Sequence, residues 1–142
     1  MFDIESYVRA DSVRQAIALL KDRPEAHLIA GGTDVLVKVR SGKVEAPCLV
    51  DIHDVAELNF IRVADNGDLA IGSGTRFSAL AASPVILEHI PVLSTAVLTI
   101  GGPQLRNMAT IGGNLCNGVP SADSASPLIA LNAASRRTSA SS

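Results

Sequence analysis

Residues 109–127, ATIGGNLCNGVPSADSASP, restrict the fold of this chain more than any other segment. They carry almost no charge and no aromatic side chain, and they are dense in glycine, hydroxyl and amide residues that add little to a hydrophobic core. The core must therefore come from the aliphatic side chains elsewhere in the 142 residues, because aromatic residues make up only 3% of the chain. This length fits one ordinary domain or a part of a larger one.

The first half of the chain alternates between helical and extended patterns. Residues 13–20 place apolar side chains at helical spacing behind a capping Asp11 or Ser12. Buried strands are predicted at residues 27–30 and 46–52, and a short helix that closes at Ser41-Gly42 is predicted between them.

A hairpin and a helical region follow. Asn66-Gly67 predicts a tight turn between two strands within residues 60–74, because both residues accept a positive φ. Helices are predicted from residue 75 to residue 100, and Pro84 and Pro91 are predicted to separate one helix from the next. This mixture of hairpin and strand–turn–helix units predicts the α+β fold class.

Composition argues against several kinds of partner. The net charge of −2 gives no reason to expect nucleic acid, and no apolar run approaches the roughly 20 residues that span a bilayer. The first residues lack the pattern of a signal peptide, so a cytoplasmic location is expected. The three histidines are dispersed, so no metal site is expected, and Cys48 and Cys116 are expected to be reduced thiols.

The run IAGGTDV indicates a first candidate binding loop. A strand leads into Gly31-Gly32, which can adopt conformations closed to other residues, and Thr33 and Asp34 then open a helix. Free amides at a helix start favour an anion such as a pyrophosphate, with Asp34 better suited to capping the helix. A plain glycine turn between strand and helix remains an alternative.

A second candidate loop repeats these ingredients in residues 110–114. Its paired glycines would let backbone amides converge on a ligand. Further along, Asp123 lies between Ser121 and Ser124, where its carboxylate could accept hydrogen bonds from ribose hydroxyls or cap a following helix.

Catalytic side chains are not evident in either loop. No nucleophile–base pair and no pair of carboxylates is placed for acid–base work, and neither a GxGxxG nor a GxxxxGK[ST] motif occurs. We therefore predict no catalytic residue and a large cofactor that performs its own chemistry against these loops.

Four segments together resemble the FAD-binding subunit of the xanthine dehydrogenase family of molybdenum hydroxylases. They are LIAGGTDVLVKVRSG, VDIHDVAELNFI, LAIGSGTRFSAL and GGPQLRNMATIGGNLCNGVPSADSASP. The resemblance implies the FAD-binding fold of the vanillyl-alcohol oxidase and p-cresol methylhydroxylase type, in its first subdomain. It also implies that the pyrophosphate lies on the first loop and the ribityl and adenosine side on the second, with Asp123 nearby. The implied cofactor-binding residues are His27, Leu28, Ile29, Ala30, Gly31, Gly32, Thr33, Asp34, Ala109, Thr110, Ile111, Gly112, Gly113, Asn114 and Asp123.

The resemblance further implies an oxidoreductase component with two partners. A large subunit would hold a molybdenum–pterin centre that hydroxylates a purine or a related heterocycle, and a small subunit would hold [2Fe-2S] clusters. Electrons would then pass through FAD on this subunit to NAD⁺ or to another acceptor.

Residues 1–132 are expected to form the N-terminal part of the FAD-binding domain, and residues 133–142 a disordered or non-native tail. Because family members are about twice as long, a truncated form is expected. A non-catalytic docking role and a stand-alone flavoprotein of the same fold are the alternatives.

Overall fold

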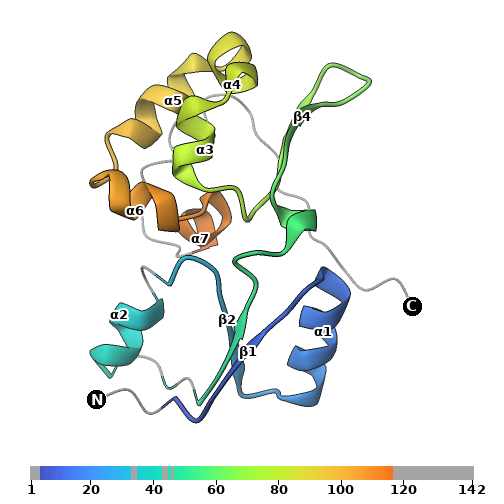
Figure 1. Ribbon diagram of the computed structural model, residues 1–142, viewed down its shortest axis with the longest axis vertical. Coiled ribbons are helices and arrows are strands. Elements are labelled where there is room, and N and C mark those ends of the chain that lie inside the picture. The colour runs from blue at the N-terminus through green and yellow to red at the C-terminus, as the bar shows by residue number, and fades with distance from the viewer. Residues whose placement is uncertain (1–3, 33–34, 43–44, 46, 117–142) are drawn as a thin grey trace.

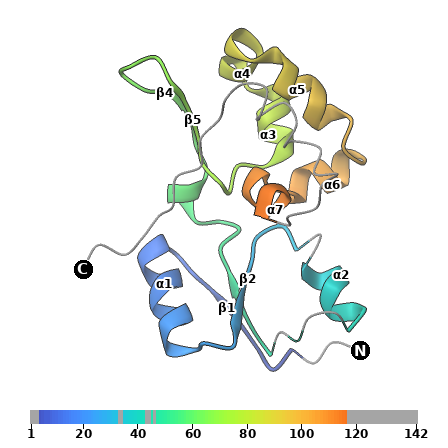
Figure 2. The same cartoon turned by 180° about the vertical axis from the view of Figure 1, so that it is seen from behind.

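A computed structural model describes residues 4–32, 35–42, 45 and 47–116 of the chain. Figures 1 and 2 show two lobes stacked along the long axis of the molecule. We call the described residues up to 58 the sheet lobe and residues 61–116 the helical lobe. The predicted tail at 133–142, Asp123, Thr33 and Asp34 lie outside the described residues.

The sheet lobe is built on a parallel sheet of three strands. The strands are β1 (Ser6–Arg9), β2 (Ala26–Ile29) and β3 (Cys48–Asp51), with β3 in the centre. All four residues of β3 are buried, as expected for an apolar central strand covered on both faces. The buried strand predicted around CLVD is thus confirmed.

Two helices cover opposite faces of this sheet. Helix α1 (Val13–Asp22) places Ala16 against Val50, whereas α2 (Val35–Arg40) places Val39 against Leu49. Because neighbouring residues of a strand point to opposite faces, the two helices must lie on opposite sides of β3, as Figures 1 and 2 show.

The helical lobe begins with a hairpin and continues as short helices. A 3₁₀ turn, η1 (Ala56–Leu58), leads into β4 (Ile61–Val63) and β5 (Leu69–Ile71), and Gly67 has a φ of 88° in the predicted turn. The helices are α3 (Phe77–Ala82), α4 (Pro84–His89), α5 (Pro91–Leu98), α6 (Pro103–Met108) and α7 (Ile111–Cys116). Their core contains Phe77, Leu80, Ile86, Leu93 and Val97, each at most 1% exposed.

The structure confirms most predicted elements and adds three. Ser12 caps α1 by accepting a hydrogen bond from the Gln15 amide at 3.0 Å, and proline occupies the first turn of α4 and α5. Strand β1 and helix α6 were not predicted. The predicted loop at 110–114 is instead the cap and first turns of α7. No helix among the described residues is long and apolar enough to cross a membrane.

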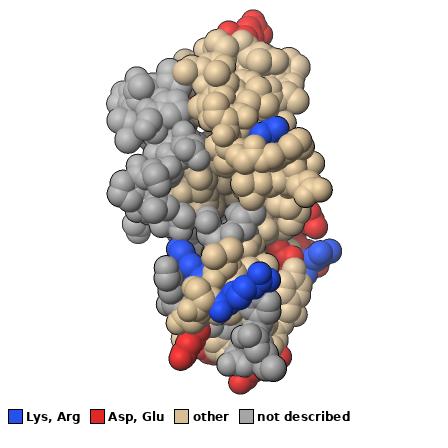
Figure 3. Space-filling view, turned by 90° about the vertical axis from the view of Figure 1, so that its left-hand side faces the viewer, with Lys and Arg blue, Asp and Glu red and all other residues tan. Residues whose placement is uncertain are grey.

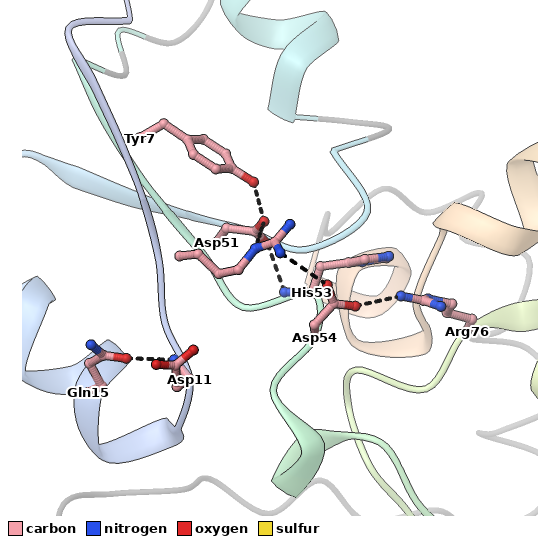
Figure 4. Close-up of polar contacts among 8 residues, drawn as sticks. Tyr7, Asp11, Gln15, Asp51, His53, Asp54 and Arg76 are labelled. Atoms are coloured by element: carbon pink, nitrogen blue, oxygen red, sulfur yellow. Dashed lines mark hydrogen bonds and ion pairs between the residues drawn. The ribbon is translucent and has the colours of Figure 1, made fainter.

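A buried carboxylate joins β1 to β3. The Asp51 side chain is 6% exposed, accepts a hydrogen bond from the Tyr7 hydroxyl, and lies 3.8 Å from Arg9 Nε (Figure 4). The His53 amide donates to its other oxygen at 2.8 Å. Since an unpaired buried charge is costly, these donors hold the ends of the two strands together.

We expect Tyr7→Phe to lower the free energy of unfolding by about 1 kcal/mol near neutral pH, a modest value because Tyr7 is 55% exposed. The hydrogen bond to Asp51, burial and the negative charge of Asp51 raise the pKa of Tyr7. A raised pKa gives stability that is complete below the unfolded value near pH 10 and is lost as the pH rises through the folded value. Urea unfolding up to about pH 11 should therefore show a steeper alkaline loss for the unmodified chain than for Tyr7→Phe. Parallel curves would contradict this assignment.

Candidate functional site

The first candidate loop leaves the carboxyl end of β2 with unused hydrogen-bond donors. The amides of Ala30, Gly31 and Gly32 donate no hydrogen bond to another described residue. Gly32 has a φ of 74°, and its carbonyl accepts a hydrogen bond from the Leu36 amide at 3.3 Å, so α2 begins directly after the turn. Unpaired amides at the carboxyl edge of a parallel sheet fit an anionic group such as a pyrophosphate.

Side chains of the first loop contribute unequally. His27 and Leu28 are exposed, whereas Ile29 is buried against Val39 and Leu49. Ile29 could therefore contact a ligand only through its backbone. The predicted roles of these residues in cofactor binding remain predictions.

The second candidate segment has its amides already engaged. The four amides from Ile111 to Asn114 donate within the protein, to Thr75 O at 3.0 Å, Ser73 O at 2.8 Å, Thr110 Oγ1 at 3.1 Å and Thr110 O at 3.0 Å. The expected convergence of these amides on a ligand is therefore not available here. Ala109, Thr110 and Ile111 are also buried, Gly112 and Asn114 are half-buried, and Gly113 is the exposed residue of this segment.

Three of the four glycines in the two segments have an internal explanation. A Cβ on Gly31 would lie 2.2 Å from Met108 O, and one on Gly112 would lie 2.6 Å from Ser73 O, so neither position has room for a side chain. Gly32 is required by its backbone, because residues with a side chain rarely adopt its φ of 74°. On Gly113 a Cβ would meet only Thr110 Oγ1, at 3.0 Å, which makes Gly113 the informative position for a ligand.

The Gly31 contact brings the two segments side by side. The missing Gly31 side chain would also lie 3.2 Å from Ala109 Cα, the first residue of the second segment. Two segments almost eighty residues apart in the sequence thus meet where the lobes join (Figure 1).

A group of polar side chains lies at the same edge of the sheet and was not predicted. Asp54 pairs with Arg76 at 2.9 Å, near Asp51 and His53 (Figure 4). His53 Nδ1 and Arg76 Nε are buried without a hydrogen-bond partner among the described residues. Buried donors and acceptors of this kind usually meet water or a ligand, so these atoms fit a polar group bound nearby. The acidic residues that follow β3 were the only signal in the sequence.

Surface charge is unevenly distributed, and the one described cysteine thiol with a shifted pKa lies at the opposite end of β3 from the first loop. On the face in Figure 3, charged side chains gather over the sheet lobe, and the helical lobe is mostly uncharged. The Cys48 thiol is free and buried at the amino end of β3, where the Ser6 hydroxyl and the Arg23 guanidinium lower its pKa. No group of His, Cys, Asp and Glu within the described residues could hold a metal ion.

We expect Gly31→Ala to lower the free energy of unfolding by about 1–3 kcal/mol, because the added methyl group pushes against the Met108 backbone. Gly102→Ala is the matched control, since its Cβ would meet nothing within 4 Å and its φ is −97°. Chemical unfolding of both variants tests this. Equal stability of Gly31→Ala and the unmodified chain would contradict the close contact between the segments.

Comparisons with known proteins agree with this arrangement. The family described as "FAD binding domain in molybdopterin dehydrogenase" matches residues 2–142. The xanthine dehydrogenase FAD-binding subunit of Escherichia coli O157:H7 is 48% identical over 133 residues, which cover 94% of this chain and 46% of that subunit. The glyceraldehyde dehydrogenase medium chain of Sulfolobus acidocaldarius is 34% identical over 128 residues, which cover 90% of this chain and 45% of that one.

The chain is also similar to a solved structure. The reconstituted CO dehydrogenase from Oligotropha carboxidovorans matches with a TM-score of 0.80 and 33% identity, over 87% of this chain and 43% of that chain. The chain thus spans about half the length of the relatives that it matches. The predicted α+β fold of the vanillyl-alcohol oxidase type is confirmed. The chain belongs to the family of FAD-binding domains in molybdopterin dehydrogenases.

Proposed function

We propose that this chain binds the phosphate and adenosine portion of FAD between the loop after β2 and the start of α7. The observation that carries this proposal is the set of amides at Ala30, Gly31 and Gly32, which donate to no other described residue and lie directly beside the second segment. Membership of an FAD-binding family supports the choice of FAD over other anionic ligands.

The proposed roles follow the chemistry of each segment. Residues 27–34 would bind the pyrophosphate, mainly through backbone amides, and residues 109–114 would line the ribityl and adenosine side, mainly through the surface around Gly113. Asp123 would accept hydrogen bonds from ribose hydroxyls. When bound, FAD supplies the redox chemistry, and the residues of this chain hold and orient it.

For the whole protein we propose the flavin subunit of a xanthine dehydrogenase-like enzyme of the cytoplasm, with residues 1–132 as the N-terminal part of its FAD-binding domain. Its partners would be a large subunit with molybdenum–pterin and a small subunit with [2Fe-2S] clusters. The electron acceptor would be NAD⁺ and the substrate a purine. The 48% identity to a xanthine dehydrogenase subunit supports this choice over other substrate classes.

A docking role is the second candidate. Leu98 in α5 and Leu105 and Met108 in α6 are 52%, 37% and 46% exposed. Apolar side chains exposed in this way favour contact with another polypeptide. Such contact is compatible with FAD binding.

We expect the purified 142-residue chain to retain flavin absorption after incubation with FAD and desalting. A colourless chain with intact secondary structure would contradict FAD binding by these two segments and would leave the docking role.

Gly113→Val tests the second segment in the same assay. The branched side chain would stand on the exposed surface that we assign to FAD, so we expect at least a tenfold weaker affinity, or about 1.4 kcal/mol. Gly102→Val is the control for an added side chain in open space. Full flavin occupancy in Gly113→Val would remove this segment from the binding site.

A further inference from the structure

Arg76, at the N-terminus of α3, holds the second segment through its backbone. It forms an isolated antiparallel bridge with Thr110. The Phe77 amide donates to Ala109 O at 3.0 Å, and the Ile111 amide donates to Thr75 O at 3.0 Å. Any movement of Arg76 relative to the sheet lobe therefore carries Ala109, Thr110 and Ile111 with it.

The side chain of Arg76 reaches the sheet lobe. Its Nη2 donates to Asp54 Oδ1 at 2.9 Å, as Figure 4 shows. Asp54 follows β3 closely in the chain, and the last residue of β3, Asp51, is in register with Ile29. The Ile52 amide also donates to Ile29 O at 2.9 Å. Asp54 is thus fixed relative to Ile29, the last residue of β2.

We propose that Arg76 is a positioning residue that, through Asp54, sets the spacing between the first loop and the start of α7. The consequence for FAD affinity rests on the function proposed above, whereas the positioning itself does not. Nothing in the sequence indicates this role, because Arg76 and Asp54 meet only in the folded chain.

Loss of the Arg76–Asp54 pair should affect the junction between the lobes more than the stability of the whole chain. The Arg76 and Asp54 side chains are 38% and 54% exposed, and exposed ion pairs contribute little to stability. Each lobe also has its own hydrophobic core, so neither depends on this pair to fold. Loss of the pair should loosen the junction while the melting temperature changes little.

Amide hydrogen exchange tests the positioning directly. In Arg76→Gln we expect exchange to accelerate about 2–5-fold in the segments 51–58 and 109–116, and to stay unchanged in α4. Arg62→Gln is the matched control, because it makes the same substitution at an arginine of the helical lobe that has no ion pair with Asp54. The Arg62 guanidinium lies 4.9 Å from the centre of the Phe60 ring instead. Unchanged exchange in both segments of Arg76→Gln would overturn the proposal, whatever the chain does with FAD.

Titration with FAD tests the consequence for binding. Arg76→Gln and Asp54→Asn should each weaken the affinity about 2–5-fold. Asp54→Asn also removes the 3.9 Å ion pair between Asp54 and Arg9, so the double variant should lose no more than Asp54→Asn alone. Arg76→Lys, which keeps the charge, should restore most of the affinity. Multiplicative losses in the double variant would overturn the link. If the unmodified chain binds no FAD, the proposed function fails, and the exchange experiment alone decides the role of Arg76.

Discussion

The geometry of the candidate site depends on close backbone contacts between the lobes, and the contact at Gly31 places the two segments side by side. Gly31 lies so close to the Met108 carbonyl that a Cβ would stand 2.2 Å from the oxygen. The two lobes have separate hydrophobic cores, so this contact limits how closely the first loop can approach the start of α7. Because backbone atoms cannot change rotamer to relieve a clash, the two segments cannot come closer than this contact allows.

The two segments contribute different chemistry to the surface where they meet. The amides of the second segment complete the N-terminus of α7 and attach it to residues 73–75. The amides of Ala30, Gly31 and Gly32 have no such task among the described residues. The hydrogen-bond donors for an anion would therefore come from the sheet lobe, and the helical lobe would contribute a contact surface without free amides in the second segment. An even division of phosphate contacts between the lobes does not fit these hydrogen bonds.

Local signals made much of the fold predictable. Ser12, Asn66-Gly67 and the prolines at 84 and 91 act within a few residues of their own position, so the sequence contains their whole explanation. Strand β1 is different, because its sequence SYVR is not strongly apolar and it is a strand through pairing with β3. Helix α7 was missed because a glycine pair argues against a helix, and only the Thr110 cap and the bonds to residues 73 and 75 compensate.

The candidate site was harder to predict from the sequence than the fold. A glycine pair after a strand reports that something must approach the backbone closely, but not whether a ligand or another part of the protein does so. The absence of a side chain at Gly31 is explained by the Met108 carbonyl, and its absence at Gly112 by the Ser73 carbonyl. Both neighbours are distant in sequence, so no local pattern connects them to these glycines. The resemblance to a flavoprotein family singled out these two segments, and the folded chain distinguishes their glycines: Gly31 lies between the lobes, Gly32 and Gly112 are required within their own lobes, and Gly113 is exposed. A glycine in such a segment can therefore be required for the folded structure itself, as Gly31 is at the junction of the lobes, whether or not it contacts a ligand.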